Sequence, residues 1–170
     1  PKPAHFSTDG AHFDRYASRS LANWEFLEEL RELWAGSLIV KGVSSISDAL
    51  RIKNIGADAI WVSNHGGRQL DSSPATIEIL PHMREALGSS YPLILDSGVR
   101  GGEDILKALV CGANFVMLGR PWLYAVGAEG ERGLQSLWHA LSFDLSVAMA
   151  QIGVRSLEEI GQQNIASFGQ

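Results

Sequence analysis

Four short apolar runs recur along this chain, and stretches with helical periodicity separate them. Each run is continuously rather than alternately apolar, which is typical of strands that are buried on both faces. Strands that alternate with helices predict a parallel sheet with right-handed crossovers. We therefore predict an α/β fold, and the expected strands are Ser37–Val40, Ala59–Val62, Leu93–Leu95 and Phe115–Leu118.

The segments between these runs carry signals for the starts and ends of helices. Asn23 can cap a first helix that Gly36 would end, and Ser45 begins a capping-box pattern. Pro81 opens the second half of a further helical stretch. The remaining helical patterns are Pro81–Leu87, Glu103–Val110 and Leu134–Ile152, with the start of a short helix at Ser156–Glu159.

All four expected strands end in polar or glycine-containing sequence. In a (β/α)₈ barrel every strand ends at one active-site mouth, whereas an open doubly wound sheet gathers its ligand contacts at one switch point. The first strand is followed by no Gly-x-Gly-x-x-Gly pattern. A barrel needs eight strands and roughly 250 residues. We therefore interpret residues 1–170 as the C-terminal half, strands 5–8, of one TIM (β/α)₈ barrel domain, with residues 1–20 as the tail of a mobile loop.

Composition argues against several classes of protein. A net charge of -5 disfavours a nucleic-acid binder, which normally carries a basic patch. No apolar run approaches the ~20 residues of a transmembrane helix. Cys111 is the single cysteine, and no Cys/His cluster has metal-ligand spacing, so we expect no disulfide and no metal site. The start at Pro1, without Met or a signal-peptide pattern, suggests that a longer sequence precedes it.

The segment Ser63-Asn64-His65-Gly66-Gly67-Arg68-Gln69 directly follows the second strand and carries the clearest chemistry. His65 can accept a proton near neutral pH, and Arg68 can hold a carboxylate through two parallel hydrogen bonds. Gly66 and Gly67 allow a sharp turn and leave room for a flat group. The alternative is a polar loop with an incidental histidine. Arginine and a glycine pair at this spacing favour a functional site.

Glycine and arginine also follow the last two strands, in Asp96-Ser97-Gly98-Val99-Arg100 and Gly119-Arg120. The loops after strands 7 and 8 of barrels form a recurrent phosphate site. A tight turn with a surface arginine is the alternative at each position, but the repetition favours phosphate. The groups available to a phosphate are the amides of Gly98, Gly101 and Gly119 and the guanidinium of Arg100 or Arg120.

Two charged residues at strand ends need partners. Lys41 follows the first strand, where a buried ammonium is costly unless an anionic ligand in the barrel mouth compensates it. The alternative is a lysine that reaches solvent from the strand end. Asp96 would fit poorly against phosphate, so we expect it to bind sugar-like hydroxyls.

These motifs resemble the FMN-dependent 2-hydroxy acid oxidases and dehydrogenases, which include glycolate oxidase, L-lactate dehydrogenase and (S)-mandelate dehydrogenase. The likeness extends from Leu21 to about Ile165. Residues 63–69 carry it, with matches at 39–42, 96–100 and 118–121. The resemblance implies oxidation of an L-2-hydroxy acid to the 2-oxo acid, with FMN as cofactor and flavin N5 as electron acceptor. His65 would be the base, and Arg68 would bind the substrate carboxylate beside it.

The resemblance also implies the contacts to FMN. Lys41 would lie at the N1/C2 carbonyl edge of the flavin, and Ser63 would contact the cofactor as well. The ribityl chain and phosphate would be held by Asp96, Ser97, Gly98, Val99, Arg100, Gly119 and Arg120. The other substrate contacts, including tyrosines, and the aspartate that orients the base would belong to the first half of the barrel.

Further expectations concern the whole protein. Its partner would be a small 2-hydroxy acid, it would form a homotetramer, and it would be cytoplasmic or peripheral on the inner face of the membrane. Residues 1–170 alone would be inactive. Another FMN- or phosphate-binding barrel, such as type 2 isopentenyl-diphosphate isomerase, and a non-catalytic FMN-binding half-barrel are the alternatives. The substrate side chain, the electron acceptor (oxygen, quinone or cytochrome) and the choice between hydride and carbanion chemistry stay open.

Overall fold

A computed structural model describes residues 23–161 of the protein, and the chain divides into two compact units, Pro1–Gly36 and Ser37–Gln170. The first unit contains helix α2 (Trp24–Leu33). As predicted, Asn23 caps it, and Asn23 Oδ1 accepts a hydrogen bond from Phe26 N at 2.9 Å. The helix ends before the predicted Gly36, because Trp34 is already extended. The predicted loop tail, residues 1–20, lies outside the described residues.

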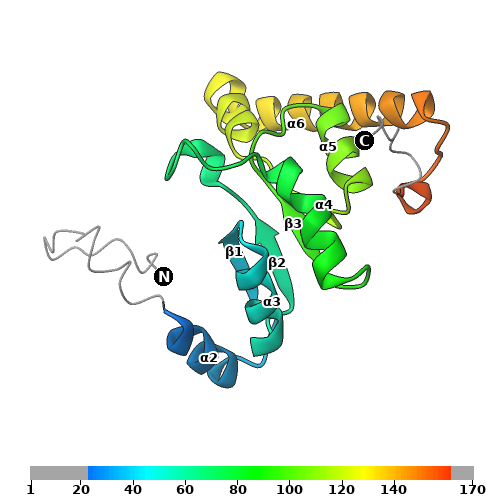
Figure 1. Ribbon diagram of the computed structural model, residues 1–170. Coiled ribbons are helices and arrows are strands. Elements are labelled where there is room, and N and C mark those ends of the chain that lie inside the picture. The colour runs from blue at the N-terminus through cyan, green and yellow to red at the C-terminus, as the bar shows by residue number, and fades with distance from the viewer. Residues whose placement is uncertain (1–22, 162–170) are drawn as a thin grey trace, which may run out of the picture. The chain divides into compact units, whose positions relative to one another are not determined.

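The second unit is built on a four-stranded parallel sheet in the order β1-β2-β3-β4 (Figure 1). Each strand pairs in parallel with the next one along the chain. The α/β class and the parallel sheet are therefore confirmed. The strands are β1 (Ile39–Val43), β2 (Ala59–Val62), β3 (Leu93–Leu95) and β4 (Phe115–Val116).

Three strand boundaries differ from the prediction. β1 begins at Ile39 rather than Ser37, and it continues past Val40, so Lys41 and Gly42 lie inside the strand rather than after it. Its pairing with β2 is irregular between Lys41 and Val43, and Gly42 has a φ of +92°. This bulge lets the strand pass through a residue that normally ends one. β4 stops at Val116, short of the predicted Leu118.

The helices of this unit follow the prediction except at the start of α6. α4 runs from Thr76 to Leu87, so Pro81 opens its second half as predicted. α6 begins at Arg120 rather than Leu134, and its backbone departs from helical geometry at Glu129 and Gly130. Ser45 caps α3 as predicted, accepting from Asp48 N. The elements are α3 (Ile46–Ile55), η1 (His65–Gly67), α4 (Thr76–Leu87), α5 (Gly102–Val110), α6 (Arg120–Gln151) and η2 (Leu157–Glu159).

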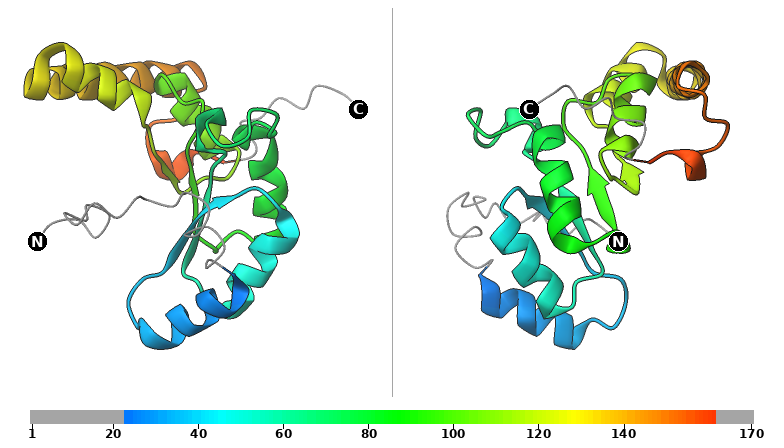
Figure 2. Two further views of the ribbon diagram at one scale, coloured as in Figure 1. Left: turned by 90° about the vertical axis from the view of Figure 1, so that its left-hand side faces the viewer. Right: turned by 45° about the vertical axis from the view of Figure 1, so that its right-hand side comes forward.

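The core lies between the sheet and the helices that connect its strands. α3 and α4 contact β1, β2 and β3, and α5 contacts β4. Ile60 and Val62 of β2 and Leu80 and Met83 of α4 are fully buried there. α5 also packs against α6 (Figure 2). A Cβ on Gly102 would lie 2.1 Å from the backbone of Leu145, so the two helices approach this closely only because that position is glycine.

Candidate active site

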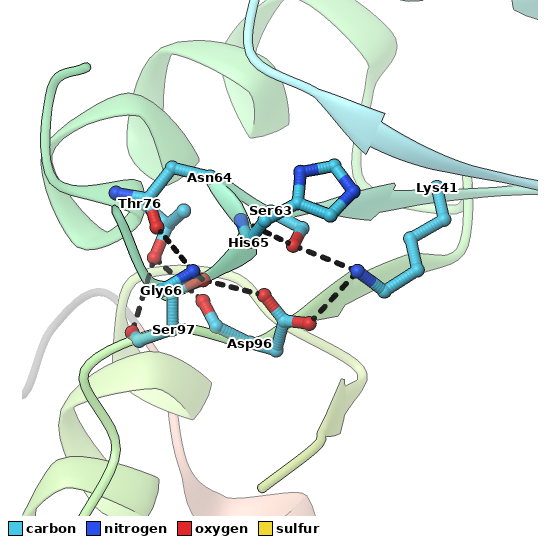
Figure 3. Close-up of polar contacts among 8 residues, drawn as sticks. All are labelled: Lys41, Ser63, Asn64, His65, Gly66, Thr76, Asp96 and Ser97. Carbon is cyan, nitrogen blue, oxygen red and sulfur yellow. Dashed lines mark hydrogen bonds and ion pairs between the residues drawn. The ribbon is translucent and has the colours of Figure 1, made fainter. Parts of the chain in front are cut away.

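Lys41, Ser63 and Asp96 come from three neighbouring strands and meet where the strands end (Figure 3). Lys41 Nζ donates a hydrogen bond to Ser63 Oγ at 3.0 Å and lies 3.3 Å from Asp96 Oδ2. The same ammonium lies 4.9 Å from the centre of the Trp61 ring, within the range of a cation–π contact. The lysine side chain remains 37% exposed. The sheet thus holds a cation in a defined position and leaves it accessible to a ligand.

Asp96 is the internal partner of this cation. One of its oxygens faces Lys41, and the other accepts a hydrogen bond of 2.7 Å from Ser97 Oγ. Both carboxylate oxygens are therefore already engaged within the protein, which fixes the direction of the carboxylate. The expectation that Asp96 binds sugar-like hydroxyls stays a prediction.

The turn after β2 has an unusual backbone. His65, Gly66 and Gly67 have φ values of +57°, +66° and +77°, in the left-handed region that glycine tolerates and histidine rarely adopts. Three side chains hold this turn in place. His65 N donates to Ser63 Oγ at 3.1 Å, and Gly66 N donates to both Asn64 Oδ1 at 3.0 Å and Ser97 Oγ at 3.1 Å. Strained backbone of this kind is concentrated at functional sites.

Gly42 makes room for the histidine ring. A Cβ on Gly42 would lie only 2.9 Å from His65 Cε1, so any larger residue would displace the imidazole. The strand was predicted to end at Val40, before Gly42, and this role of Gly42 was missed. The sequence contained part of the signal for this role, because an isolated glycine within a strand pattern indicates a bulge or a close approach of another group.

A pocket of about 410 Å³ lies beside this turn. The loops after β2 and β3, with residues from the starts of α4, α5 and α6, line it. The Arg120 guanidinium lies against Gly66, where a Cβ would be 3.2 Å from Nη2. Gly98 and Gly119 face open space, with no atom within 4 Å of a Cβ built on either residue. Two of the predicted phosphate-binding glycines thus have room for a ligand against their backbone.

The amino end of α5 is already bound by carboxylates. Arg100 N and Gly101 N donate to Asp104 Oδ2 at 2.9 and 3.3 Å, and Gly102 N donates to Asp144. The interpretation of Gly101 as an amide available to phosphate is therefore wrong, because a side chain of the protein takes that bond. Its signal in the sequence was Asp104, at the third helical position, where a carboxylate can reach back to cap the helix.

The remaining predicted residues are placed in different ways. Arg68 and Arg100 have exposed side chains, and neither forms a side-chain hydrogen bond or ion pair with another residue of the described range 23–161. Arg68 N donates to His65 O at 3.3 Å, so its backbone continues the turn. Val99 is buried. The structure therefore joins Lys41, Ser63, Asp96, Ser97 and the His65 turn into one cluster and leaves the side chains of Arg68 and Arg100 outside it.

The sequence of the chain matches the family described as FMN-dependent dehydrogenase over residues 2–167. The chain belongs to this family. The resemblance seen in the motifs is thereby confirmed, together with FMN as the cofactor of the family and with its oxidoreductase class.

Similar proteins include bacterial and plant enzymes. An L-lactate dehydrogenase of Pseudomonas syringae pv. syringae is 44% identical over 138 residues, covering 81% of this chain and 36% of that protein. A peroxisomal (S)-2-hydroxy-acid oxidase of Oryza sativa subsp. japonica is 37% identical over 168 residues, covering 97% and 46%. The chain spans 36% to 41% of the length of three similar bacterial proteins that are named L-lactate dehydrogenase.

Solved structures agree with these similarities. A soluble mutant of the membrane-associated (S)-mandelate dehydrogenase from Pseudomonas putida superimposes with a TM-score of 0.79 at 42% identity, over 84% of this chain and 40% of that chain.

Within residues 23–161 no helix is both long and apolar enough to cross a bilayer. Residues 23–161 also contain no group of three or more His, Cys, Asp or Glu side chains that could hold a metal ion.

Proposed function

We propose that the full-length protein oxidises an L-2-hydroxy acid to the 2-oxo acid with FMN, His65 acting as the base and flavin N5 accepting the electrons. The observation that carries this proposal is the convergence of Lys41, Ser63 and Asp96 beside the strained His65 turn, in a member of the FMN-dependent dehydrogenase family. The homologues are named for 2-hydroxy acid substrates, lactate and mandelate among them.

The described strands form the second half of the barrel in this proposal. β1 and β4 each pair with one neighbour among residues 23–161, so each presents an edge. Ile39 and Phe115 on these edge strands are 46% and 57% exposed, which is costly for large apolar side chains. Four further strands would pair with both edges and cover these residues. The tetrameric state and the cytoplasmic or membrane-peripheral location stay predictions.

The residues present fit FMN. Open space over Gly98 and Gly119 leaves their backbone accessible to a phosphate, and Arg120 supplies a guanidinium at the same pocket. Lys41 would lie against the electron-rich edge of the flavin, with Ser63 beside it. Ser97, Val99 and Arg100 belong to the loop that would follow the ribityl chain, and Asp96 would direct Lys41. FMN supplies the redox chemistry, and the protein supplies position and field.

The protein's own part in the reaction is to bind, orient and deprotonate the substrate. Arg68 directly follows the left-handed glycines, and its exposed guanidinium forms no hydrogen bond or ion pair with another residue of the range 23–161. It would hold the carboxylate with two hydrogen bonds. His65, with its ring in the space left by Gly42, would accept the substrate proton. Fixing the carboxylate and the base together is the positioning effect that lowers the barrier.

Anaerobic reduction of the flavin tests this function. The full-length protein should purify with flavin that is released as FMN, and glycolate, L-lactate or (S)-mandelate should bleach its absorbance, whereas D-lactate and (R)-mandelate should not. Bound FMN that no 2-hydroxy acid bleaches would make the protein a binder rather than an enzyme. A protein that cannot be loaded with FMN would contradict the proposed phosphate site at Gly98, Gly119 and Arg120.

A further inference from the structure

Thr76 is buried beneath the cluster, with 2% of its surface exposed, and no step of the proposed reaction uses it. It is the first residue of α4, and its Oγ1 lies 2.6 Å from Asp96 O and 3.3 Å from Ser97 O (Figure 3). Both carbonyls belong to the loop that leaves β3. The hydroxyl thus joins the start of one helix to the end of the neighbouring strand.

This hydroxyl does not cap its own helix. Threonine near a helix start usually accepts a hydrogen bond from the first turn, but the N-cap of α4 is Ala75 and forms no side-chain cap bond. Thr76 instead donates to backbone carbonyls of a different loop, in a buried position where an unpaired carbonyl would cost free energy. Its contribution therefore concerns the loop after β3 rather than the stability of α4.

The two residues held by Thr76 are those that direct the cluster. Asp96 turns its carboxylate toward Lys41 Nζ, 3.3 Å away. Ser97, at a φ of +75° that is unfavourable for a serine, donates to Asp96 Oδ1 and accepts from Gly66 N of the His65 turn. The loop after β3 therefore positions both Asp96, which pairs with the Lys41 ammonium, and Ser97, which anchors the His65 turn.

We propose that Thr76 is a positioning residue: its hydroxyl holds the loop after β3 so that Asp96 faces Lys41 and Ser97 faces the His65 turn. Its effect on turnover rests on the proposed function, whereas its effect on the His65 turn does not. The two parts can therefore be tested separately.

The test compares three substitutions in the full-length protein. Thr76→Val removes the hydroxyl and keeps the shape, and Thr76→Ser keeps the hydroxyl. Tyr91→Phe is the matched control, because the half-buried Tyr91 also donates a hydroxyl hydrogen bond to a backbone carbonyl, Ala57 O at 2.7 Å, at the opposite end of the sheet. The readouts are the rate of anaerobic flavin reduction at saturating 2-hydroxy acid and the hydrogen exchange of the Gly66 amide, which needs no FMN.

Thr76→Val should slow flavin reduction about tenfold or more, since small displacements of catalytic groups have large effects on rate, and should speed exchange at Gly66. Thr76→Ser should restore both to within about twofold, and Tyr91→Phe should change neither. Parental values for Thr76→Val would overturn the proposal, and so would a Thr76→Ser protein as impaired as Thr76→Val.

Two other outcomes also bear on the proposals. If no 2-hydroxy acid reduces the flavin of the parent protein, the proposed function fails, and hydrogen exchange of the Gly66 amide alone tests the positioning role of Thr76. If Thr76→Val does not fold, Thr76→Ala takes its place, because it also removes the hydroxyl that donates to Asp96 O. Faster exchange at Gly66 in Thr76→Ala would then support the proposal, and unchanged exchange would overturn it.

Discussion

The two ends of the parallel sheet are both polar, but they differ in how their polar groups are satisfied. At the amino ends of the strands, Arg84 is 9% exposed and its guanidinium is surrounded by acceptors. It donates to Gly88 O and Tyr91 O at 2.7 Å each, to Gly112 O at 3.0 and 2.6 Å, and to Asn114 Oδ1 at 2.7 Å. These bonds tie together the loops that lead into β3 and β4.

At the carboxyl ends, the polar groups are held in place but remain accessible. Lys41 is paired with Asp96 yet more than a third exposed, and His65 stands on left-handed backbone. Gly98 and Gly119 face open space. We expect the saturated hydrogen bonds at one end to serve stability and the accessible, strained groups at the other end to bind a ligand, as at the two faces of a barrel.

The largest effect should come from Arg84. Arg84→Met leaves several buried carbonyls without their donor and should lower the free energy of unfolding by about 3–5 kcal/mol. Denaturant unfolding of the full-length protein measures the loss, and Arg132→Met, at an exposed arginine of α6, should stay within about 0.5 kcal/mol. Flavin reduction per bound FMN should be nearly parental. A stable Arg84→Met protein with slow reduction would reverse the roles of the two ends.

His65 should show the opposite pattern. His65→Gln should bind FMN and unfold within about 1 kcal/mol of the parent, but reduce its flavin about 10² times more slowly or worse. Stopped-flow reduction gives the rate, and His82→Gln, at an exposed histidine of α4, is the control. Parental reduction in His65→Gln would remove this residue from the chemistry.

Arg68 should act mainly on substrate binding. Arg68→Lys replaces a two-pronged contact with a point charge and should raise KM about tenfold, with a smaller change in kcat. Steady-state kinetics of the full-length protein separates the two constants, with Arg132→Lys as control. If both constants are unchanged, the exposed guanidinium of Arg68 does not enter the site on substrate binding.

The smallest effect concerns the amino-end loops at alkaline pH. Burial raises the pKa of the Cys111 thiol, and burial together with the Asp58 carboxylate raises the pKa of the Tyr91 phenol. The unfolded chain loses these protons first, near the ordinary values of 9.0 and 10.0. The stabilisation by these two groups is therefore complete below about pH 9 and declines as the pH rises. In Cys111→Ala and Tyr91→Phe, the free energy of unfolding from denaturant curves should decline less steeply with rising pH than in the parent. The parental pH dependence in both variants would contradict this prediction.

Local patterns in the sequence predicted much of the fold. Continuous apolarity located β2 and β3 at their observed bounds, because strands buried on both faces leave little ambiguity. Gly42 misled the prediction, since a bulge carries β1 through a residue that normally ends a strand. The first part of α6 was missed because Gly127 and Gly130 interrupt its helical pattern, and the backbone does depart from helical geometry at Glu129 and Gly130.

The site was predictable where chemistry follows a strand and hidden where it depends on long-range contacts. Parallel strands end side by side, so Lys41, Ser63 and Asp96 could be expected to lie close together. Thr76 lies twenty positions before Asp96, and only the fold brings its hydroxyl to that carbonyl. The use of the Gly101 amide by Asp104, in contrast, is a local contact whose capping spacing was present in the sequence and was overlooked.

The crystal structure of the full-length protein with FMN would show whether the carboxyl ends of β1–β4 form the flavin site. We expect the phosphate against the backbone of Gly98 and Gly119 beside Arg120, with the flavin edge at Lys41 Nζ and the reactive face toward His65. The Arg84 network at the other end should be unchanged. FMN bound away from the carboxyl ends of β1–β4, or a flavin ring out of reach of both Lys41 and His65, would contradict this expectation.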